Sequence, residues 1–206
     1  MSLIQIKNLS FRYDNGIENI FDDVSVNLDT NWKLGLIGRN GKGKTTLLQI
    51  LSGKLKYYGI ITKNVAIDYF PFKVDENKLT MEAIQDFCMA EDWEIIKELN
   101  ILNFNIEALY RAYKTLSGGE KVKAMLVALF LKDNNFLLID EPTNHLDLIN
   151  KETIESLLND YKGTLIIVSH DRYLINKVCT KLLVIEKNKT TLYNYGYKEY
   201  LEKRVV

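Results

Sequence analysis

Residues 38–46 have the types and spacing of a phosphate-binding loop. A glycine at position 38 is followed by four residues and then by Gly43, Lys44 and Thr45. The backbone N–H groups of such a loop surround the α- and β-phosphates of a nucleotide, the lysine reaches the β- and γ-oxygens, and the threonine hydroxyl ligates Mg²⁺. We therefore predict that a nucleotide is bound by Gly38, Arg39, Asn40, Gly41, Lys42, Gly43, Lys44, Thr45 and Thr46.

Two carboxylates follow an apolar run farther along the chain, since Asp140 and Glu141 come directly after Phe136–Ile139. The carboxyl ends of parallel strands open onto the ligand crevice of a sheet, so we expect both acids beside the nucleotide. Asp140 would hold Mg²⁺ directly or through water. Glu141 would polarise the attacking water or place it in line with the γ-phosphate. Taken alone, the pair is equally compatible with a solvated strand end.

A serine and two glycines stand at the start of a predicted apolar helix within Leu116–Leu131. They present a hydroxyl and bare backbone N–H groups at the positive end of the helix dipole, which favours contact with a γ-phosphate. A serine with a glutamate three residues later is also typical of a helix capping box. The two roles are compatible, and the predicted contact residues are Ser117, Gly118, Gly119 and Glu120.

A histidine stands just beyond another apolar run, because His170 follows Leu165–Val168 by two positions. At the end of a buried strand it would point at the γ-phosphate and sense its presence. An isolated histidine in this setting would more often be structural. We predict that Glu141 and His170 are catalytic and that Thr45 and Asp140 hold the metal.

The surrounding sequence predicts the elements that position these residues. Trp32–Ile37 has the pattern of a short buried strand before the loop, and Thr45–Leu51 that of a helix after it. Phe136–Ile139 and Leu165–Val168 are apolar throughout, as parallel strands buried on both faces are. The other predicted elements are antiparallel strands at 3–13 and 24–28, β-rich runs within 58–69, helices at 80–102, 116–131, 148–161 and 172–178, a hairpin at 182–193, and a last helix from Tyr197.

Composition narrows the class of protein. The 206 residues contain 27 basic and 27 acidic side chains, so a net charge of zero provides no general electrostatic footprint for nucleic acid. The two cysteines, Cys88 and Cys179, lie far apart and are expected to be buried free thiols in a reducing cytosol. The longest apolar run, Ala124–Leu131, is too short to span a bilayer. We expect a cytoplasmic chain with no transmembrane segment.

The four motifs, in this order, resemble the nucleotide-binding domain of the ATP-binding-cassette (ABC) superfamily. They correspond to Walker A at Gly38–Thr46, the signature at Leu116–Glu120, Walker B at Phe136–Glu141, and the switch histidine at His170. The resemblance implies an α/β P-loop NTPase domain over residues 1–206, with a mixed parallel core sheet, an N-terminal antiparallel β-subdomain and a small helical subdomain. The core and β-subdomain would comprise about 1–72 and 132–206, and the helical subdomain about 73–131.

The same resemblance implies ATP and Mg²⁺ as cofactors and ATP hydrolysis as the activity. Tyr13 would stack on the adenine, although a strand tyrosine facing the core or solvent is the alternative. Asp147 would be the D-loop aspartate at a dimer interface. A partner cassette would supply its own signature to the γ-phosphate, so that two ATP molecules lie between two cassettes.

Two segments, Glu141–Asp147 and Ser169–Arg172, resemble the ABC-F branch, whose tandem cassettes lack transmembrane domains and act on ribosomes. Trp32–Thr46 and the short helical insert most resemble the first cassette of ABC-F antibiotic-resistance proteins of the Lsa/Vga type, which protect ribosomes. We therefore expect a fragment without its linker and second cassette, whose partner is that cassette or, as a homodimer, another copy. The alternatives are the ATPase subunit of a membrane transporter and an ATP-gated clamp with little turnover.

One position departs from the family pattern. Tyr69–Phe72 places phenylalanine where the family usually has the Q-loop glutamine. A phenyl ring can neither ligate Mg²⁺ nor hold the lytic water. We expect ATP binding to persist, and hydrolysis either to be slow or to rely on water in the missing position.

Overall fold

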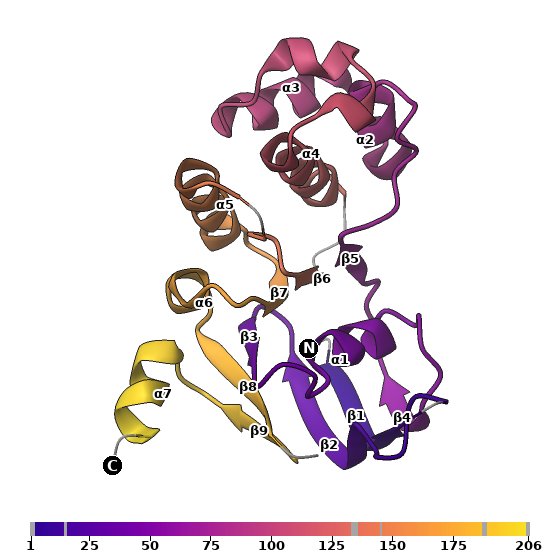
Figure 1. Cartoon of the computed structure of the whole chain (residues 1–206), viewed down its shortest axis with the longest axis vertical. Coiled ribbons are helices and arrows are strands. Elements are labelled where there is room, and N and C mark those ends of the chain that lie inside the picture. The colour runs from indigo at the N-terminus through magenta and orange to yellow at the C-terminus, as the bar shows by residue number, and fades with distance from the viewer. Residues whose placement is uncertain (1–2, 15, 133–135, 145, 187–188, 205–206) are drawn as a thin grey trace. The chain divides into compact units, whose positions relative to one another are not determined.

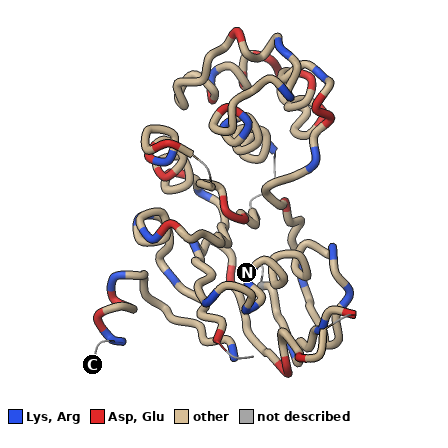
Figure 2. Tube along the Cα trace, in the orientation of Figure 1, with Lys and Arg blue, Asp and Glu red and all other residues tan. Residues whose placement is uncertain are grey.

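The computed structural model of the chain describes residues 3–14, 16–132, 136–144, 146–186 and 189–204 (Figure 1). The chain forms two compact units. We call them the core unit, comprising Met1–Tyr69, Asn135–Glu141 and Lys162–Val206, and the helical unit, comprising Phe70–Asn134 and Pro142–Tyr161. Basic and acidic residues are interspersed along the chain in both units (Figure 2), in keeping with the balanced composition.

A six-stranded sheet forms the centre of the core unit, in the order β5-β6-β7-β3-β8-β9. The neighbouring strands β6 and β7, β7 and β3, and β3 and β8 pair in parallel, whereas β9 closes a hairpin antiparallel to β8. The central runs are buried on both faces, which explains their unbroken apolar sequences. The strands are β3 (Lys33–Ile37), β5 (Asp68–Phe70), β6 (Phe136–Asp140), β7 (Thr164–Val168), β8 (Lys181–Glu186) and β9 (Lys189–Tyr193).

A three-stranded antiparallel sheet, ordered β2-β1-β4, completes the core unit. Its strands are β1 (Leu3–Phe11), β2 (Phe21–Asp29) and β4 (Tyr58–Thr62). The buried side chains of β1 and β2 share one hydrophobic cluster with α1 (Lys44–Leu51) and with β3, β6, β7 and β8, and the partly buried Ile61 of β4 packs against it. The helix that follows the predicted loop is therefore held by both sheets. The fold class predicted from sequence, a mixed α/β core with an antiparallel β-subdomain and a helical part, is confirmed.

The helical unit has its own hydrophobic cluster. Its elements are α2 (Thr80–Cys88), α3 (Asp92–Ile101), the 3₁₀ helices η1 (Ile106–Tyr110) and η2 (Tyr113–Thr115), α4 (Gly118–Phe130) and α5 (Leu148–Asp160). The single helix predicted over 80–102 is wrong, because Met89 adopts the left-handed conformation (φ 54°) and ends α2. A methionine gives no sequence signal for such a break.

The division between the units differs from the predicted boundaries in one segment. Residues 142–161, expected in the core, cluster with the helical unit. Side-chain packing explains this, because Leu157 of α5 joins the hydrophobic cluster of that unit and Tyr161 stacks on Phe130 with ring centroids 4.6 Å apart. That the two units act together as one ATP-binding domain stays a prediction.

Two further helices, α6 (Arg172–Val178) and α7 (Tyr197–Arg204), belong to the core unit. Within the described ranges, no helix combines the length and the apolarity needed to cross a membrane. Residues 187–188 of the predicted hairpin, 205–206 of the last helix, and His145 of the segment that resembles the ABC-F branch fall outside the described residues.

Candidate functional site

The phosphate-binding loop joins β3 to α1, and close packing requires glycine at two of its positions, Gly38 and Gly43. Gly43 has φ 99°, and a Cβ there would lie 2.6 Å from Cγ2 of Ile20 and 2.8 Å from Cζ of Phe21. A Cβ on Gly38 would lie 2.5 Å from the carbonyl oxygen of Ile185. The antiparallel sheet and β8 therefore fix the course of the loop before any ligand binds.

Lys44 occupies the inside of this loop. Its ammonium donates to the carbonyl oxygens of Gly38 at 3.0 Å and Arg39 at 3.3 Å, and the residue is only 8% exposed. Burial lowers the pKa of Lys44, while the charges of Glu141 and Asp140 act in the opposite direction. The loop thus holds a cation on its inner side, and contact of Lys44 with β- and γ-phosphate oxygens stays a prediction.

Thr45 and Asp140 lie together as a magnesium site requires. The Thr45 hydroxyl donates to Oδ1 of Asp140 at 3.1 Å. The carboxylate stands at the end of β6, and its other oxygen, Oδ2, accepts a 2.7 Å hydrogen bond from the hydroxyl of Tyr69. Mg²⁺ prefers carboxylate, hydroxyl and phosphate oxygens, so this pair suits the metal of a nucleotide complex. Tyr69 was not among the predicted site residues.

Glu141 and His170 also meet within the core unit. The backbone N–H of His170 donates to Oε2 of Glu141 at 3.1 Å, and Nε2 of the ring lies 3.3 Å from Oε1. Glu141 itself has φ 53° and donates its N–H to the carbonyl oxygen of Val168 at 2.8 Å. The left-handed backbone turns the chain at the end of β6, and places the carboxylate against the end of β7.

Tyr13 lies at the rim of the loop. Its hydroxyl hydrogen-bonds the hydroxyl of Thr46 at 3.0 Å, its ring meets Phe11 edge-on with centroids 4.8 Å apart, and the residue remains 45% exposed. An aromatic face is therefore available beside the phosphate loop, as adenine stacking requires. A cavity of about 370 Å³ joins the predicted residues of this unit, being lined by Tyr13, Ile20, Asn40, Gly41, Gly43, Lys44, Thr45, Thr46, Glu141, Val168 and His170.

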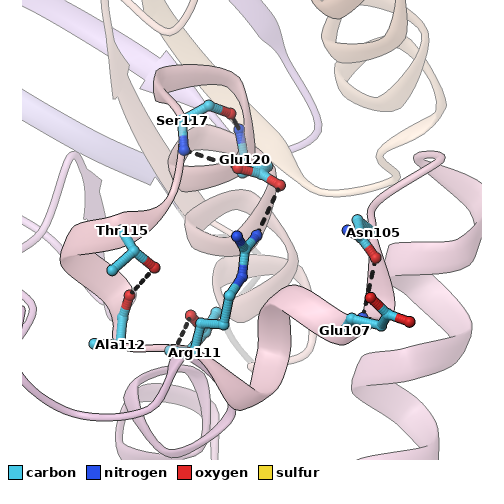
Figure 3. Close-up of polar contacts among 8 residues, drawn as sticks. Asn105, Glu107, Arg111, Ala112, Thr115, Ser117 and Glu120 are labelled. Atoms are coloured by element: carbon cyan, nitrogen blue, oxygen red, sulfur yellow. Dashed lines mark hydrogen bonds and ion pairs between the residues drawn. The ribbon is translucent and has the colours of Figure 1, made fainter.

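The glycines of the predicted signature begin α4 in the helical unit, and Ser117 is the N-cap of that helix. Figure 3 shows Ser117 beside Glu120. The N–H of Ser117 donates to the Glu120 carboxylate at 2.8 Å, and the Ser117 hydroxyl accepts from the N–H of Glu120 at 3.3 Å. Arg111 lies 3.6 Å from the same carboxylate. The capping-box interpretation is thus confirmed, and contact of this segment with a partner's phosphate stays a prediction. Glu120 is already engaged by the helix end.

Asp147 caps α5. Its carboxylate accepts the backbone N–H and the side-chain amide of Asn150, each at 2.8 Å, and these hydrogen bonds lower the pKa of Asp147. The Asn150 amide also covers the signature helix, because a Cβ on Gly119 would lie 2.7 Å from its Nδ2. Asn150 therefore links the predicted D-loop residue to the signature. Sequence spacing contained no signal for this contact, which depends on how α4 and α5 pack.

Phe72, at the position of the family's Q-loop glutamine, packs within the helical unit. Its ring stacks on Phe87 of α2, with centroids 3.7 Å apart and planes 12° from parallel. The ammonium of Lys132 lies 4.5 Å from the Phe87 ring centre. Phenylalanine at position 72 thus has a local structural role, because its ring adds an aromatic pair to the cluster around α2.

Known proteins with similar sequences and folds were found for this chain. The family model described as ABC transporter matches residues 21–144. The chain is 35% identical over 215 residues to ABC transporter F family member 2 of Arabidopsis thaliana, covering 99% of this chain and 31% of that protein. It is 36% identical over 209 residues to the putative ATP-binding protein YdiF of Bacillus subtilis, covering 98% and 32%.

A further relative is named for translation. The energy-dependent translational throttle protein EttA of Haemophilus influenzae is 30% identical over 212 residues, covering 97% of this chain and 38% of that protein. The chain thus spans about a third of the length of these curated relatives. Among solved structures, "An inward-facing conformation of a putative metal-chelate type ABC transporter" matches with a TM-score of 0.76 and 23% identity, covering 94% of this chain and 83% of that one. This last match shows likeness of fold.

Proposed function

The chain belongs to the ABC transporter family of nucleotide-binding domains, and from this premise we propose that it binds ATP with Mg²⁺ and hydrolyses it as one cassette of an ABC-F protein that acts on the ribosome. The observation that carries the nucleotide part is the grouping of Lys44, Thr45, Asp140 and Glu141 around one loop. Each has the chemistry that phosphoryl transfer to water needs.

The roles follow from the geometry of the core unit. Tyr13 would stack on the adenine, and Lys44 would place its charge against the β- and γ-phosphates. Thr45 and Asp140 would hold Mg²⁺, which when bound neutralises charge on the phosphate oxygens. Glu141 would accept a proton from the attacking water or orient it, and His170, which contacts both Glu141 oxygens, would keep that carboxylate in place and meet the γ-phosphate.

The signature belongs to the other unit of the chain, and we propose that it serves a partner cassette. Ser117, Gly118 and Gly119 present the N-terminal end of α4, where N–H groups and the helix dipole favour an anion. Two cassettes would then close on two ATP molecules, and hydrolysis would release them. The partner is the second cassette of a longer chain or, for this chain alone, a second copy. Asp147 would lie at that interface.

The ABC-F assignment is supported by the names of the similar proteins, which include F-family members and a translational throttle protein. We accordingly propose that the protein works in the cytoplasm, where translation occurs. Within that branch we propose ribosome protection against antibiotics, on the resemblance of Trp32–Thr46 and the short helical insert to the Lsa/Vga type. A membrane-transporter ATPase would use the same nucleotide site, and the cellular fraction in which the protein is found distinguishes the two.

The test uses the protein expressed in bacteria in its native gene context, with Glu141→Gln to hold the ATP-bound state. The variant is expected to sediment with ribosomes in the presence of Mg-ATP and to leave them when nucleotide is removed. Sedimentation with washed membranes, and not with ribosomes, would overturn the ABC-F proposal in favour of a transporter subunit. Growth in lincosamide, pleuromutilin or streptogramin A then tests protection, and unchanged drug sensitivity of expressing cells would overturn that finer part.

A further inference from the structure

We propose that Tyr69 is the positioning residue of the magnesium site, and that its phenol holds Asp140 in the orientation in which this carboxylate and the Thr45 hydroxyl face one metal ion. The inference rests on the proposed nucleotide function and deepens it. It assigns to the β5 strand a contact that the sequence motifs did not predict.

The two oxygens of Asp140 have different partners. Oδ2 accepts from the Tyr69 hydroxyl at 2.7 Å, and Oδ1 accepts from the Thr45 hydroxyl at 3.1 Å. Two hydrogen bonds on opposite oxygens fix the rotation of the carboxylate about its Cβ–Cγ bond. The shorter of the two hydrogen bonds comes from Tyr69 and occupies Oδ2. Oδ1 is therefore the oxygen that faces the Thr45 hydroxyl. A metal ion entering between Thr45 and Asp140 therefore meets a preset ligand.

The tyrosine is itself held in place. Its ring packs against the hydrophobic cluster of the core unit, and the ammonium of Lys54 lies 3.5 Å from the ring centre. These contacts on the ring hold the Tyr69 hydroxyl at Oδ2 of Asp140.

Phe72, three positions after Tyr69, offers no polar group to the metal site, which makes the hydrogen bond from Tyr69 to Asp140 the polar contribution of this segment. Position 72 has no carboxamide, and its phenyl ring is stacked on Phe87. The same segment nevertheless contributes a polar group to the metal site through Tyr69, which donates to the metal-holding carboxylate. Tyr69 acts through Asp140 and is not itself a ligand, because its hydroxyl proton is directed at Oδ2.

The decisive experiment separates metal binding from nucleotide binding. Tyr69→Phe removes one oxygen and leaves the ring in place. Tyr58→Phe, on the exposed strand β4, is the matched control. Affinity for a fluorescent ATP analogue is measured in EDTA and during titration with Mg²⁺. Tyr69→Phe is expected to leave the affinity in EDTA unchanged and to raise the Mg²⁺ concentration for half-maximal binding by about tenfold, as loss of a hydrogen bond to a charged group predicts. Tyr58→Phe should behave as the wild type.

Each other outcome overturns the proposal in a recognisable way. Equal Mg²⁺ dependence in Tyr69→Phe and the wild type would show that the phenol does not position Asp140. A similar loss of affinity with and without Mg²⁺ would show a general structural role. If the wild type binds no ATP analogue under either condition, the proposed function fails and this inference fails with it. Should Tyr69→Phe not fold, Lys54→Ala, which withdraws the cation from the ring, replaces it with an expected shift of about threefold in the same direction.

Discussion

His170 contacts Glu141 at both carboxylate oxygens. Its backbone N–H donates to Oε2 at 3.1 Å, and its ring nitrogen Nε2 lies 3.3 Å from Oε1. The two residues follow the ends of neighbouring parallel strands, Glu141 one position after β6 and His170 two positions after β7, so the sheet brings them close together. A carboxylate held in this manner keeps one orientation, which is the property that a base acting on a bound water molecule requires.

Glu141→Gln is therefore expected to keep ATP binding and to reduce turnover at least about 100-fold, because the amide has the same shape but cannot accept a proton. Phosphate release and ATP affinity measure the two effects separately. Glu152→Gln, an exposed position on α5, is the matched control and should match the wild type. Undiminished phosphate release by Glu141→Gln would remove Glu141 from the catalytic role.

Lys44→Ala is expected to weaken ATP binding at least about tenfold, since it removes a charge-assisted contact to phosphate. The same change also frees the carbonyl oxygens of Gly38 and Arg39, which the ammonium now satisfies. Lys56→Ala, at an exposed position outside the loop, controls for the loss of one positive charge. Equal ATP affinity in the Lys44 and Lys56 variants would contradict the assignment.

The sequence was sufficient for the elements whose pattern is local. Phe136–Ile139 and Leu165–Val168 are unbroken apolar runs, and both became parallel strands buried on two faces. Ser117 and Glu120 have the spacing of a capping box, and both of its hydrogen bonds are present. In each case a few adjacent residues contain the whole physical cause.

Features that depend on packing between distant segments were not predictable. Tyr69 reaches Asp140 across 71 positions, and the choice of β5 as the neighbour of β6 decides that contact. The Asn150 contact with Gly119 depends on where α5 lies against α4. The break at Met89 is a left-handed turn at a residue other than glycine, so the local sequence contains no signal for it.

Gly119 and Gly118 differ in the space that an added side chain would meet. A side chain at Gly119 meets the Asn150 amide, which Asp147 holds, whereas one at Gly118 meets nothing within 4 Å. Gly119→Ala is therefore expected to be less stable than Gly118→Ala by about 1 kcal/mol, the scale of the hydrogen bond that Asn150 must give up. Thermal unfolding measures the difference, and Gly119→Ala with Asn150→Ala should recover it. Equal stabilities of the two single variants would show that Asn150 yields freely.

Phe72→Gln tests whether the missing glutamine limits hydrolysis. The change removes the stack on Phe87 and is expected to reduce stability by about 1–2 kcal/mol, and to raise turnover several-fold by supplying the carboxamide. Phe72→Leu separates the effects, since it loses the same ring without gaining a polar group. Chemical denaturation and phosphate release are the measurements. A turnover in Phe72→Gln no higher than in Phe72→Leu would show that position 72 does not set the rate.

The buried thiol of Cys179 can be used to probe the stability of the core unit and the dependence of that stability on pH. The residue is 4% exposed, and burial raises the pKa of its thiol from 9.0 to about 12, against a lowering by the charge of Lys33. Above pH 9 the unfolded chain releases this proton while the folded chain keeps it. The free energy of unfolding should therefore fall as pH rises from about 9 to about 12, by up to about 1.4 kcal/mol per pH unit.

The measurement compares urea unfolding at pH 8 and pH 10 in Cys88→Ser, which leaves one thiol, and in Cys88→Ser with Cys179→Ala, which leaves none. Other titrating groups contribute equally in both variants. The larger fall in the free energy of unfolding that is expected in Cys88→Ser is therefore due to Cys179. Ellman's reagent should label this thiol only at the rate at which the core unit unfolds, because the native thiol is both covered and protonated. Labelling of the native protein as fast as of a free thiol, or equal falls in the two variants, would contradict the buried state of Cys179.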